Sequence, residues 1–175
     1  MRRYLAAVGA VVVLSVTAFA QDLASQVPLL GPRAVTWAEG AEADALLRGS
    51  PLAPRVRALA HAVGVAQPNR VRVVIVDRMP LPTEPLLRNA AAAMGLGEDN
   101  VTGLTLGYAI FVRRGHERDP RLLSHELRHV AQYEAAGGIA PFLAKHLVDL
   151  VQHGYDDSPY EVDARAHERA TLPRA

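Results

Sequence analysis

The sequence contains no cysteine, a single lysine and few aromatic residues, which make up 5% of its 175 residues. Without cysteine, disulfide bonds, iron–sulfur clusters and thiolate-bound zinc are excluded, so any metal ion must be bound by His, Asp or Glu. The formal net charge of +1 also lacks the strong positive excess that is typical of nucleic-acid-binding proteins. We therefore expect no nucleic-acid partner.

Hydrophobic residues make up 50% of the chain and charged residues 21%. This balance is typical of a globular protein and not of a disordered one. A chain of 175 residues is long enough for one domain with a substantial core and short for two.

The amino-terminal residues have the pattern of a secretory signal peptide. Arg2 and Arg3 precede an apolar run over residues 5–16, and residues 18–20 (Ala-Phe-Ala) supply an A-x-A cleavage site. The apolar run is shorter than the roughly 20 residues that a membrane-spanning helix needs. We therefore predict a signal peptide over residues 1–20, export to the periplasm or the medium, and no membrane span after cleavage.

Turn residues and hydrophobic periodicity divide the rest of the chain. Prolines and a glycine predict a linker or irregular lead-in over residues 21–36, followed by one domain over residues 37–175. In that domain a β-branched run predicts a strand at 71–76, and residues 101–112 predict a second strand or a hairpin. Helices are expected within 37–63 (two), 84–94, 120–135, 141–153 and 159–170. The pattern predicts an α+β fold that is mainly helical, with a small sheet.

Residues 125–129 (His-Glu-Leu-Arg-His) form an H-E-x-x-H motif inside a predicted helix. Residues four apart lie on one face of a helix, so the imidazoles of His125 and His129 can bind one metal ion. Glu126 lies one position round the helix, where its carboxylate can take a proton from water beside the metal and pass it to a leaving group. Because Zn²⁺ favours two imidazoles and a carboxylate, we predict a zinc site with Glu126 as catalytic base.

A third protein ligand must come from elsewhere, since Ala135 occupies the position of the third His in extended motifs. We favour Glu161, at the start of the last predicted helix, because a carboxylate completes His₂Glu zinc sites. The same Glu also forms an S-x-x-E capping box with Ser158, which is a competing role for its carboxylate. Asp163 and His153 are the alternative ligands, and Asp163 is also a candidate acceptor for an imidazole N–H.

Two tyrosines and one strand lie near the motif in the sequence. Tyr133 is expected to pack beneath the site, because it lies on the same helix face as His125. Tyr155 is either a donor to a developing oxyanion or an ordinary loop aromatic. The strand over residues 105–112 is either an ordinary sheet edge or a surface that pairs with an extended peptide.

These residues resemble the gluzincin branch of zinc metallopeptidases. More narrowly, residues 106–166 are similar to small, uncharacterised bacterial zincin-like domains, in which a strand leads into an H-E-x-x-H-x-x-Q-Y helix and a P-x-E-x-[DE]-A segment follows. The matching pieces here are residues 125–133 and 159–164. The resemblance implies a zincin-like fold, with His125, His129 and Glu161 as zinc ligands and Glu126 as base, and it implies no particular substrate.

The leading hypothesis is a zinc metallopeptidase that cleaves a peptide or protein substrate outside the cytoplasm. The alternative is a non-catalytic module in which the same ligands hold zinc for structure or interaction. Glu126 distinguishes the two, because a purely structural site does not need it. A further alternative is an exported helical binding protein that binds no metal.

Overall fold

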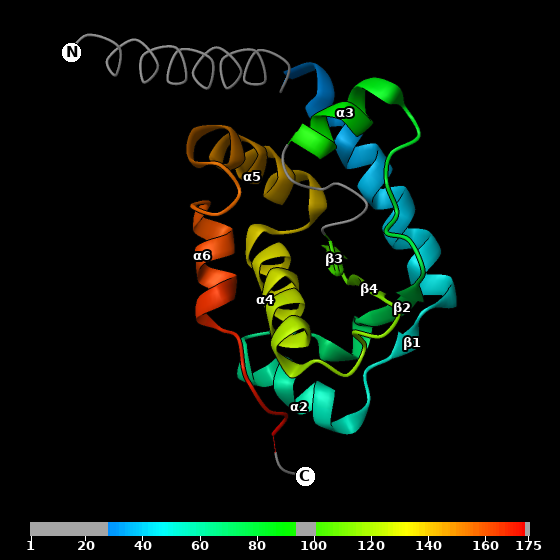
Figure 1. Ribbon diagram of the computed structural model, residues 1–175, viewed down its shortest axis with the longest axis vertical. Helices are drawn as coiled ribbons and strands as arrows, with labels where there is room; N and C mark the ends of the chain where they lie inside the picture. The colour runs from blue at the N-terminus through cyan, green and yellow to red at the C-terminus, as the bar shows by residue number, and fades with distance from the viewer. Residues whose placement is uncertain (1–27, 94–100, 174–175) are drawn as a thin grey trace, which may run out of the picture.

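The computed structural model describes residues 28–93 and 101–173, and the predicted signal peptide and residues 21–27 lie outside the described residues. Within them, helices and a small mixed sheet form an α+β fold that is mainly helical, as the sequence predicted (Figure 1). In these two stretches of chain every helix is too short or too polar to cross a lipid bilayer.

A helical segment at 28–48 opens the described chain. The elements that follow are β1 (Ser50–Pro51), α2 (Pro54–Ala62), a 3₁₀ turn η1 (Pro68–Arg70), β2 (Arg72–Val76), α3 (Pro85–Ala93), β3 (Gly103–Leu106), β4 (Ala109–Arg113), α4 (Pro120–Ala136), α5 (Ile139–His153) and α6 (Pro159–Ala166).

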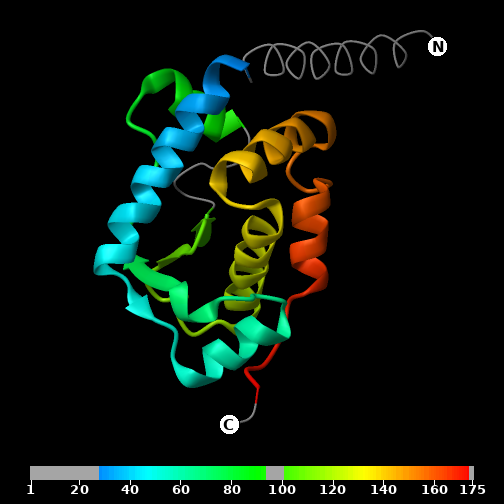
Figure 2. The same ribbon diagram turned by 180° about the vertical axis from the view of Figure 1, so that it is seen from behind.

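The sheet lies between two helical layers (Figures 1 and 2). Its strand order is β1-β2-β4-β3, with β2 parallel to β4 and the other two pairs antiparallel. Side chains alternate between the faces of a strand. Accordingly, Ile110 and Val112 of β4 pack toward α2 and α4, while Ala109 and Phe111 pack toward the helix at 28–48.

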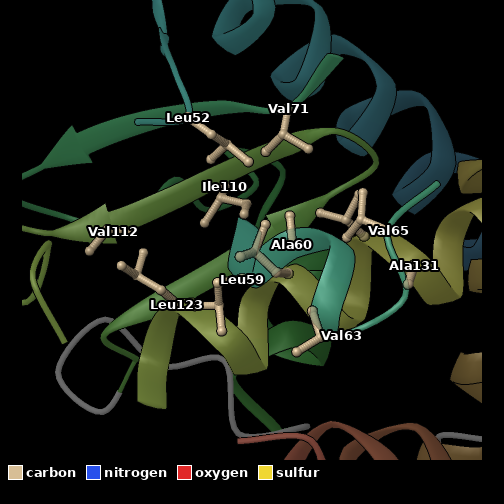
Figure 3. Packing of buried hydrophobic residues seen from close by; sticks show 12 residues of the cluster. Leu52, Leu59, Ala60, Val63, Val65, Val71, Ile110, Val112, Leu123 and Ala131 are labelled. Atoms are coloured by element: carbon tan, nitrogen blue, oxygen red, sulfur yellow. The ribbon is translucent and has the colours of Figure 1, made fainter. Parts of the chain in front are cut away.

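The larger core joins α2 and α4 to the face of the sheet that carries Ile110 and Val112. Figure 3 shows Leu59 of α2, Ile110 of β4 and Leu123 of α4 pointing toward one another, and these three side chains are at most 4% exposed. Burying a leucine or isoleucine side chain contributes roughly 1.5–3 kcal/mol, so this contact fixes α4 against the sheet. The H-E-x-x-H motif therefore lies on a helix that the core holds in place.

The bounds of α4 agree with the sequence prediction. The Asp119 carboxylate accepts a hydrogen bond from the backbone N–H of Arg121 (2.9 Å), and Pro120 occupies the first helical position. The helix ends where Gly137 takes a φ of +91°, a conformation that side-chain-bearing residues rarely adopt. Both signals are local, which is why the sequence located this helix well.

The predicted irregular lead-in over residues 21–36 was wrong for its described part, because residues 28–36 are helical. Leu30 of this helix packs with Leu87 and Ala90 of α3, and this tertiary contact outweighs the Pro and Gly signals. The two-residue strand β1 was not predicted, since so short a segment carries no alternation.

Two helix ends also differ from the prediction. Helix α5 begins at Ile139 and not at Pro141, because proline is tolerated in the first turn of a helix. Helix α6 ends at Ala166 and not near residue 170. Beyond it, the backbone N–H of Arg169 donates to the Ser124 hydroxyl (2.8 Å), a tertiary contact that leads the chain away from the helix.

Candidate metal centre

His125, His129 and Glu161 come together at the contact between α4 and α6. The Nε2 atoms of the two imidazoles are 3.1 Å apart, and each lies 3.4 Å from an oxygen of the Glu161 carboxylate. The side chains of both histidines are largely buried, with exposed fractions of 14% and 11%, and that of Glu161 is 3% exposed. Within residues 28–93 and 101–173, this is the one group of His, Asp and Glu side chains placed to hold a metal ion.

The spacing of these donor atoms fits a small tetrahedral cation. Ligands at about 2.0–2.2 Å from a tetrahedral zinc ion stand about 3.3–3.6 Å from one another. The observed separations of 3.1 and 3.4 Å are close to that range. In addition, Oε2 of Glu161 is buried without a hydrogen-bond partner, and its ion pair with the Arg165 guanidinium is long, at 3.9 Å. A buried carboxylate oxygen that is so weakly paired favours a bound cation. The group could therefore hold a metal ion.

The structure distinguishes between the alternative roles of Glu161, Asp163 and His153. The Ser158 hydroxyl makes no capping bond and is buried without a partner, so the capping box does not form and the Glu161 carboxylate is turned toward the histidines. Asp163 pairs with Arg128 through contacts of 2.7 and 3.1 Å. His153 is exposed at the last residue of α5. Neither Asp163 nor His153 belongs to the donor group.

Gln132 determines which nitrogen of His129 carries the proton. Its amide nitrogen donates to the backbone carbonyl of Tyr160 (2.9 Å) and to the carboxylate of Asp163 (2.7 Å). Both of these groups only accept, so the amide oxygen must face Nδ1 of His129, 2.8 Å away. Nδ1 therefore donates, and the lone pair of the neutral ring is on Nε2, which is the nitrogen that faces the donor group.

The bonds of Gln132 and Arg128 also join α4 to α6. Tyr160 and Asp163 both lie on α6, one residue before and two residues after Glu161. The Arg128 guanidinium adds its bidentate contact with Asp163 and donates to the carbonyl of Val63 (3.0 Å). Burial raises the pKa of Asp163, but hydrogen bonds from Arg128 and Gln132 outweigh it, so the net pKa is lowered. These hydrogen bonds hold α6, which carries Glu161, beside α4, which carries His125 and His129.

A second carboxylate lies beside His125. Its Nδ1 lies 3.4 Å from Oε1 of Glu168, which leaves Nε2 for the donor group. Burial lowers the pKa of His125, but the carboxylates of Glu161, Glu126 and Glu168 outweigh it, and the net pKa is raised. The site thus concentrates negative charge around the imidazoles, which favours a cation.

Glu161 and Tyr155 influence each other. Burial raises the pKa of Glu161, but the two imidazoles and the Tyr155 hydroxyl outweigh it, so the carboxyl is held ionised. Burial, followed by the charges of Glu161 and Glu126, raises the pKa of Tyr155. The phenol therefore keeps its proton at neutral pH and is a hydrogen-bond donor beside the donor group. Tyr155 lies in the turn after α5 and is 41% exposed, and its role as a donor to an oxyanion stays a prediction.

Glu126 lies beneath the donor group, against β3. Its Oε2 accepts a hydrogen bond from the Thr105 hydroxyl (2.7 Å), and the residue is 4% exposed. The same hydroxyl lies 3.1 Å from the Glu126 backbone carbonyl. With His129 and Glu161, Glu126 lines one side of a cavity, so its carboxylate and the donor group face the same space.

Tyr133 packs as expected from the sequence. It is 4% exposed, its ring lies 3.9 Å from that of Phe142 between centroids, and it contributes to the wall of the same cavity. Burial, followed by the charges of Glu42 and Glu126, raises the pKa of Tyr133.

Comparison of the chain with protein-family models, with curated proteins and with solved structures returned no match. The site is therefore interpreted from its own geometry.

Sequence reasoning did not assign roles to Thr105, Gln132 or Glu168. For Gln132 a signal was present, because a residue three positions after His129 lies on the same helix face. Thr105 and Glu168 come from other elements, and no local pattern connects them to the motif.

Proposed function

We propose that this chain is a zinc metallopeptidase that cleaves peptide bonds of a peptide or protein substrate outside the cytoplasm. The observation that carries the proposal is that His125, His129 and Glu161 meet at tetrahedral spacing while the carboxylate of Glu126 faces the same cavity. Two imidazoles and one carboxylate are a donor set that suits zinc and leaves a position open for reaction. Export is proposed from the signal-peptide pattern of residues 1–20.

His125, His129 and Glu161 would hold the zinc ion, with Gln132 orienting the ring of His129. When bound, zinc supplies a Lewis acid that polarises a carbonyl group and makes water more acidic. Glu126 takes a proton from the attacking water on its carboxylate and returns it to the leaving nitrogen, and Thr105 orients that carboxylate. The Tyr155 hydroxyl donates a hydrogen bond to the oxygen on which negative charge develops.

The competing function is a non-catalytic module, in which zinc would only join α4 to α6. The feature that favours catalysis is the burial of Glu126, an ionisable side chain that makes no contribution to a structural ligand set. A carboxylate buried beside an apolar cavity is costly for stability and is expected where chemistry needs it.

The test measures metal content and peptide hydrolysis together, for the wild-type protein and for His129→Ala and Glu126→Gln. We expect about one zinc per chain in the wild type and in Glu126→Gln, loss of zinc in His129→Ala, and hydrolysis only in the wild type. Circular dichroism checks that each variant is folded. Equal hydrolysis by Glu126→Gln would remove the base assignment, zinc without hydrolysis would favour the non-catalytic module, and absence of metal after reconstitution would reject the proposal.

A further inference from the structure

An apolar cavity opens beside the metal centre. Its volume is about 130 Å³, and Glu126, His129 and Glu161 lie on one side of it. The remaining wall is mostly apolar and comes from the helix at 28–48, α3, β3 and α5, with side chains that include Trp37, Leu87, Leu104, Phe142, Leu143 and Leu150. These elements gather at the end of the molecule where α3 and α5 lie (Figures 1 and 2).

The chemistry of the wall disfavours acidic occupants. Among the described residues, those lining the cavity include no lysine, arginine or aspartate. Its ionisable groups away from the donor side are Tyr133, whose pKa is raised, and His146, whose pKa burial lowers to about 4. Both are therefore neutral near pH 7. An acidic side chain would lose its hydration here without gaining a Lys or Arg partner from the wall.

The volume limits the occupant to a single side chain. An apolar cavity of about 150 Å³ in a protein interior takes up one benzene molecule. A space of about 130 Å³ therefore suits a leucine side chain or a phenyl ring. Since His129 and Glu161 border it directly, the side chain belongs to a residue next to the reacting bond.

We propose that this cavity is the specificity pocket of the centre and receives one bulky, uncharged, apolar side chain from a residue flanking the scissile peptide bond. The claim that the residue flanks a scissile bond rests on the proposed function, whereas binding of an apolar group depends only on the cavity. The two parts are tested separately.

Toluene, the analogue of the phenylalanine side chain, is the first probe, and acetate, the analogue of aspartate, is its charged counterpart. Both are titrated by NMR into the metal-free full chain. We expect binding of toluene and none of acetate. The variant Ala91→Leu places a larger side chain on the lining residue Ala91 and is expected to abolish toluene binding. Ala92→Leu, an equal change at the exposed neighbour on α3, is the matched control and is expected to keep it.

The second arm uses zinc-loaded protein and peptides that differ at one position, with Phe, Leu, Ala or Asp. We expect cleavage beside Phe or Leu to exceed cleavage beside Ala or Asp by roughly 10- to 200-fold in kcat/KM. Leu143→Ala, which enlarges the cavity, is expected to shift the preference toward Trp.

Each outcome decides one of the two parts. Toluene binding without hydrolysis of any peptide would support the apolar pocket and reject the peptidase. Failure of toluene to bind the wild type, tighter binding of dodecanoate than of toluene, or equal cleavage beside Phe and Asp would overturn the pocket, whatever the overall rate of hydrolysis.

Discussion

Gly103 of β3 lies directly against the carboxylate of Glu126. A Cβ atom placed on Gly103 would stand 2.8 Å from Cδ of Glu126 and 2.9 Å from Cδ1 of Leu122, well inside van der Waals contact. No left-handed backbone conformation requires glycine at this position. The residue is thus needed for the space that it leaves, and this space determines where the carboxylate of Glu126 can lie.

The substitution Gly103→Ala is therefore expected to displace the Glu126 carboxylate and to spare the metal ligands. We expect peptide hydrolysis to fall by roughly 100-fold or more, since a positioned general base contributes about 10²–10⁴ in rate. Zinc content is expected to stay at the wild-type level. Steady-state kinetics and metal analysis on the same samples measure both quantities.

Gly40→Ala is the matched control for this variant. Gly40 lies within the helix at 28–48, and a Cβ atom there meets nothing within 4 Å. Activity is expected to be unchanged and stability to rise by roughly 0.5–1 kcal/mol, because alanine favours a helix over glycine. Full activity in Gly103→Ala would show that Glu126 is not constrained as described.

Gln132→Glu keeps an acceptor for Nδ1–H of His129 but removes the amide that donates to α6. It is expected to weaken zinc binding by roughly 10- to 100-fold, the usual effect of altering a residue behind a metal ligand. The new carboxylate would face the carboxylate of Asp163 and would no longer donate to the Tyr160 carbonyl. The hydrogen bonds between α4 and α6 would therefore be weakened. Affinity is measured by competition with a chromophoric chelator. ¹⁵N NMR of His129 reports which ring nitrogen carries the proton, and we expect it to stay on Nδ1 because the new carboxylate accepts from it.

Adding Asp163→Asn to this variant is expected to restore much of the affinity. An asparagine amide can donate to Glu at position 132 while its oxygen still accepts from Arg128. Gln152→Glu, the same change on the exposed side of α5, controls for the added charge and is expected to bind zinc like the wild type. If the double variant recovers no zinc affinity, the proposed role of the hydrogen bonds between α4 and α6 is contradicted.

His146 is expected to make the metal-free protein less stable in mild acid. Its ring packs against Phe142 and Tyr160, Nδ1 has no hydrogen-bond partner, and burial lowers its pKa to about 4. The unfolded chain takes up a proton at this residue below about pH 6.5, whereas the folded chain does so only near pH 4. The free energy of unfolding therefore decreases as the pH is lowered through this window, by an amount on the order of 1–3 kcal/mol.

Urea unfolding at pH 7.5 and pH 5, with chelator present, measures the effect. In His146→Phe the fall should be smaller than in the wild type, since phenylalanine does not titrate and fits among the aromatic rings. His153→Phe, at an exposed position of the same helix, should behave like the wild type. Equal pH dependence in His146→Phe and the wild type would show that His146 does not resist protonation.

The features that the sequence predicted well are those that short-range chemistry fixes. The bounds of α4 follow from Asp119, Pro120 and Gly137, because capping and a left-handed glycine act within one turn. The spacing of His125 and His129 places both on one face of that helix for the same reason. By contrast, the helix at 28–36 was missed, since its Pro and Gly residues are overridden by packing against α3.

The choice among third ligands was left to the tertiary structure. From the sequence, Glu161 was favoured as a ligand, but a capping box with Ser158 competed for the same carboxylate. The packing of α6 on α4 turns its carboxylate toward the imidazoles and leaves the Ser158 hydroxyl buried and unpartnered. No interaction within residues 158–161 could have decided this, because the imidazoles lie more than thirty residues earlier in the chain.

By itself, the sequence determined an α+β fold, a helix that carries two histidines on one face, and the absence of any thiolate ligand. Only the tertiary structure decided that Glu161 completes the donor group, that Gln132 fixes the tautomer of His129, and that an apolar cavity borders the centre. The physical reason is the distance along the chain over which each interaction acts. Periodicity and capping act over a few residues, whereas the donor group and the cavity wall are assembled from segments that only the packing of α4, α6 and the sheet brings together.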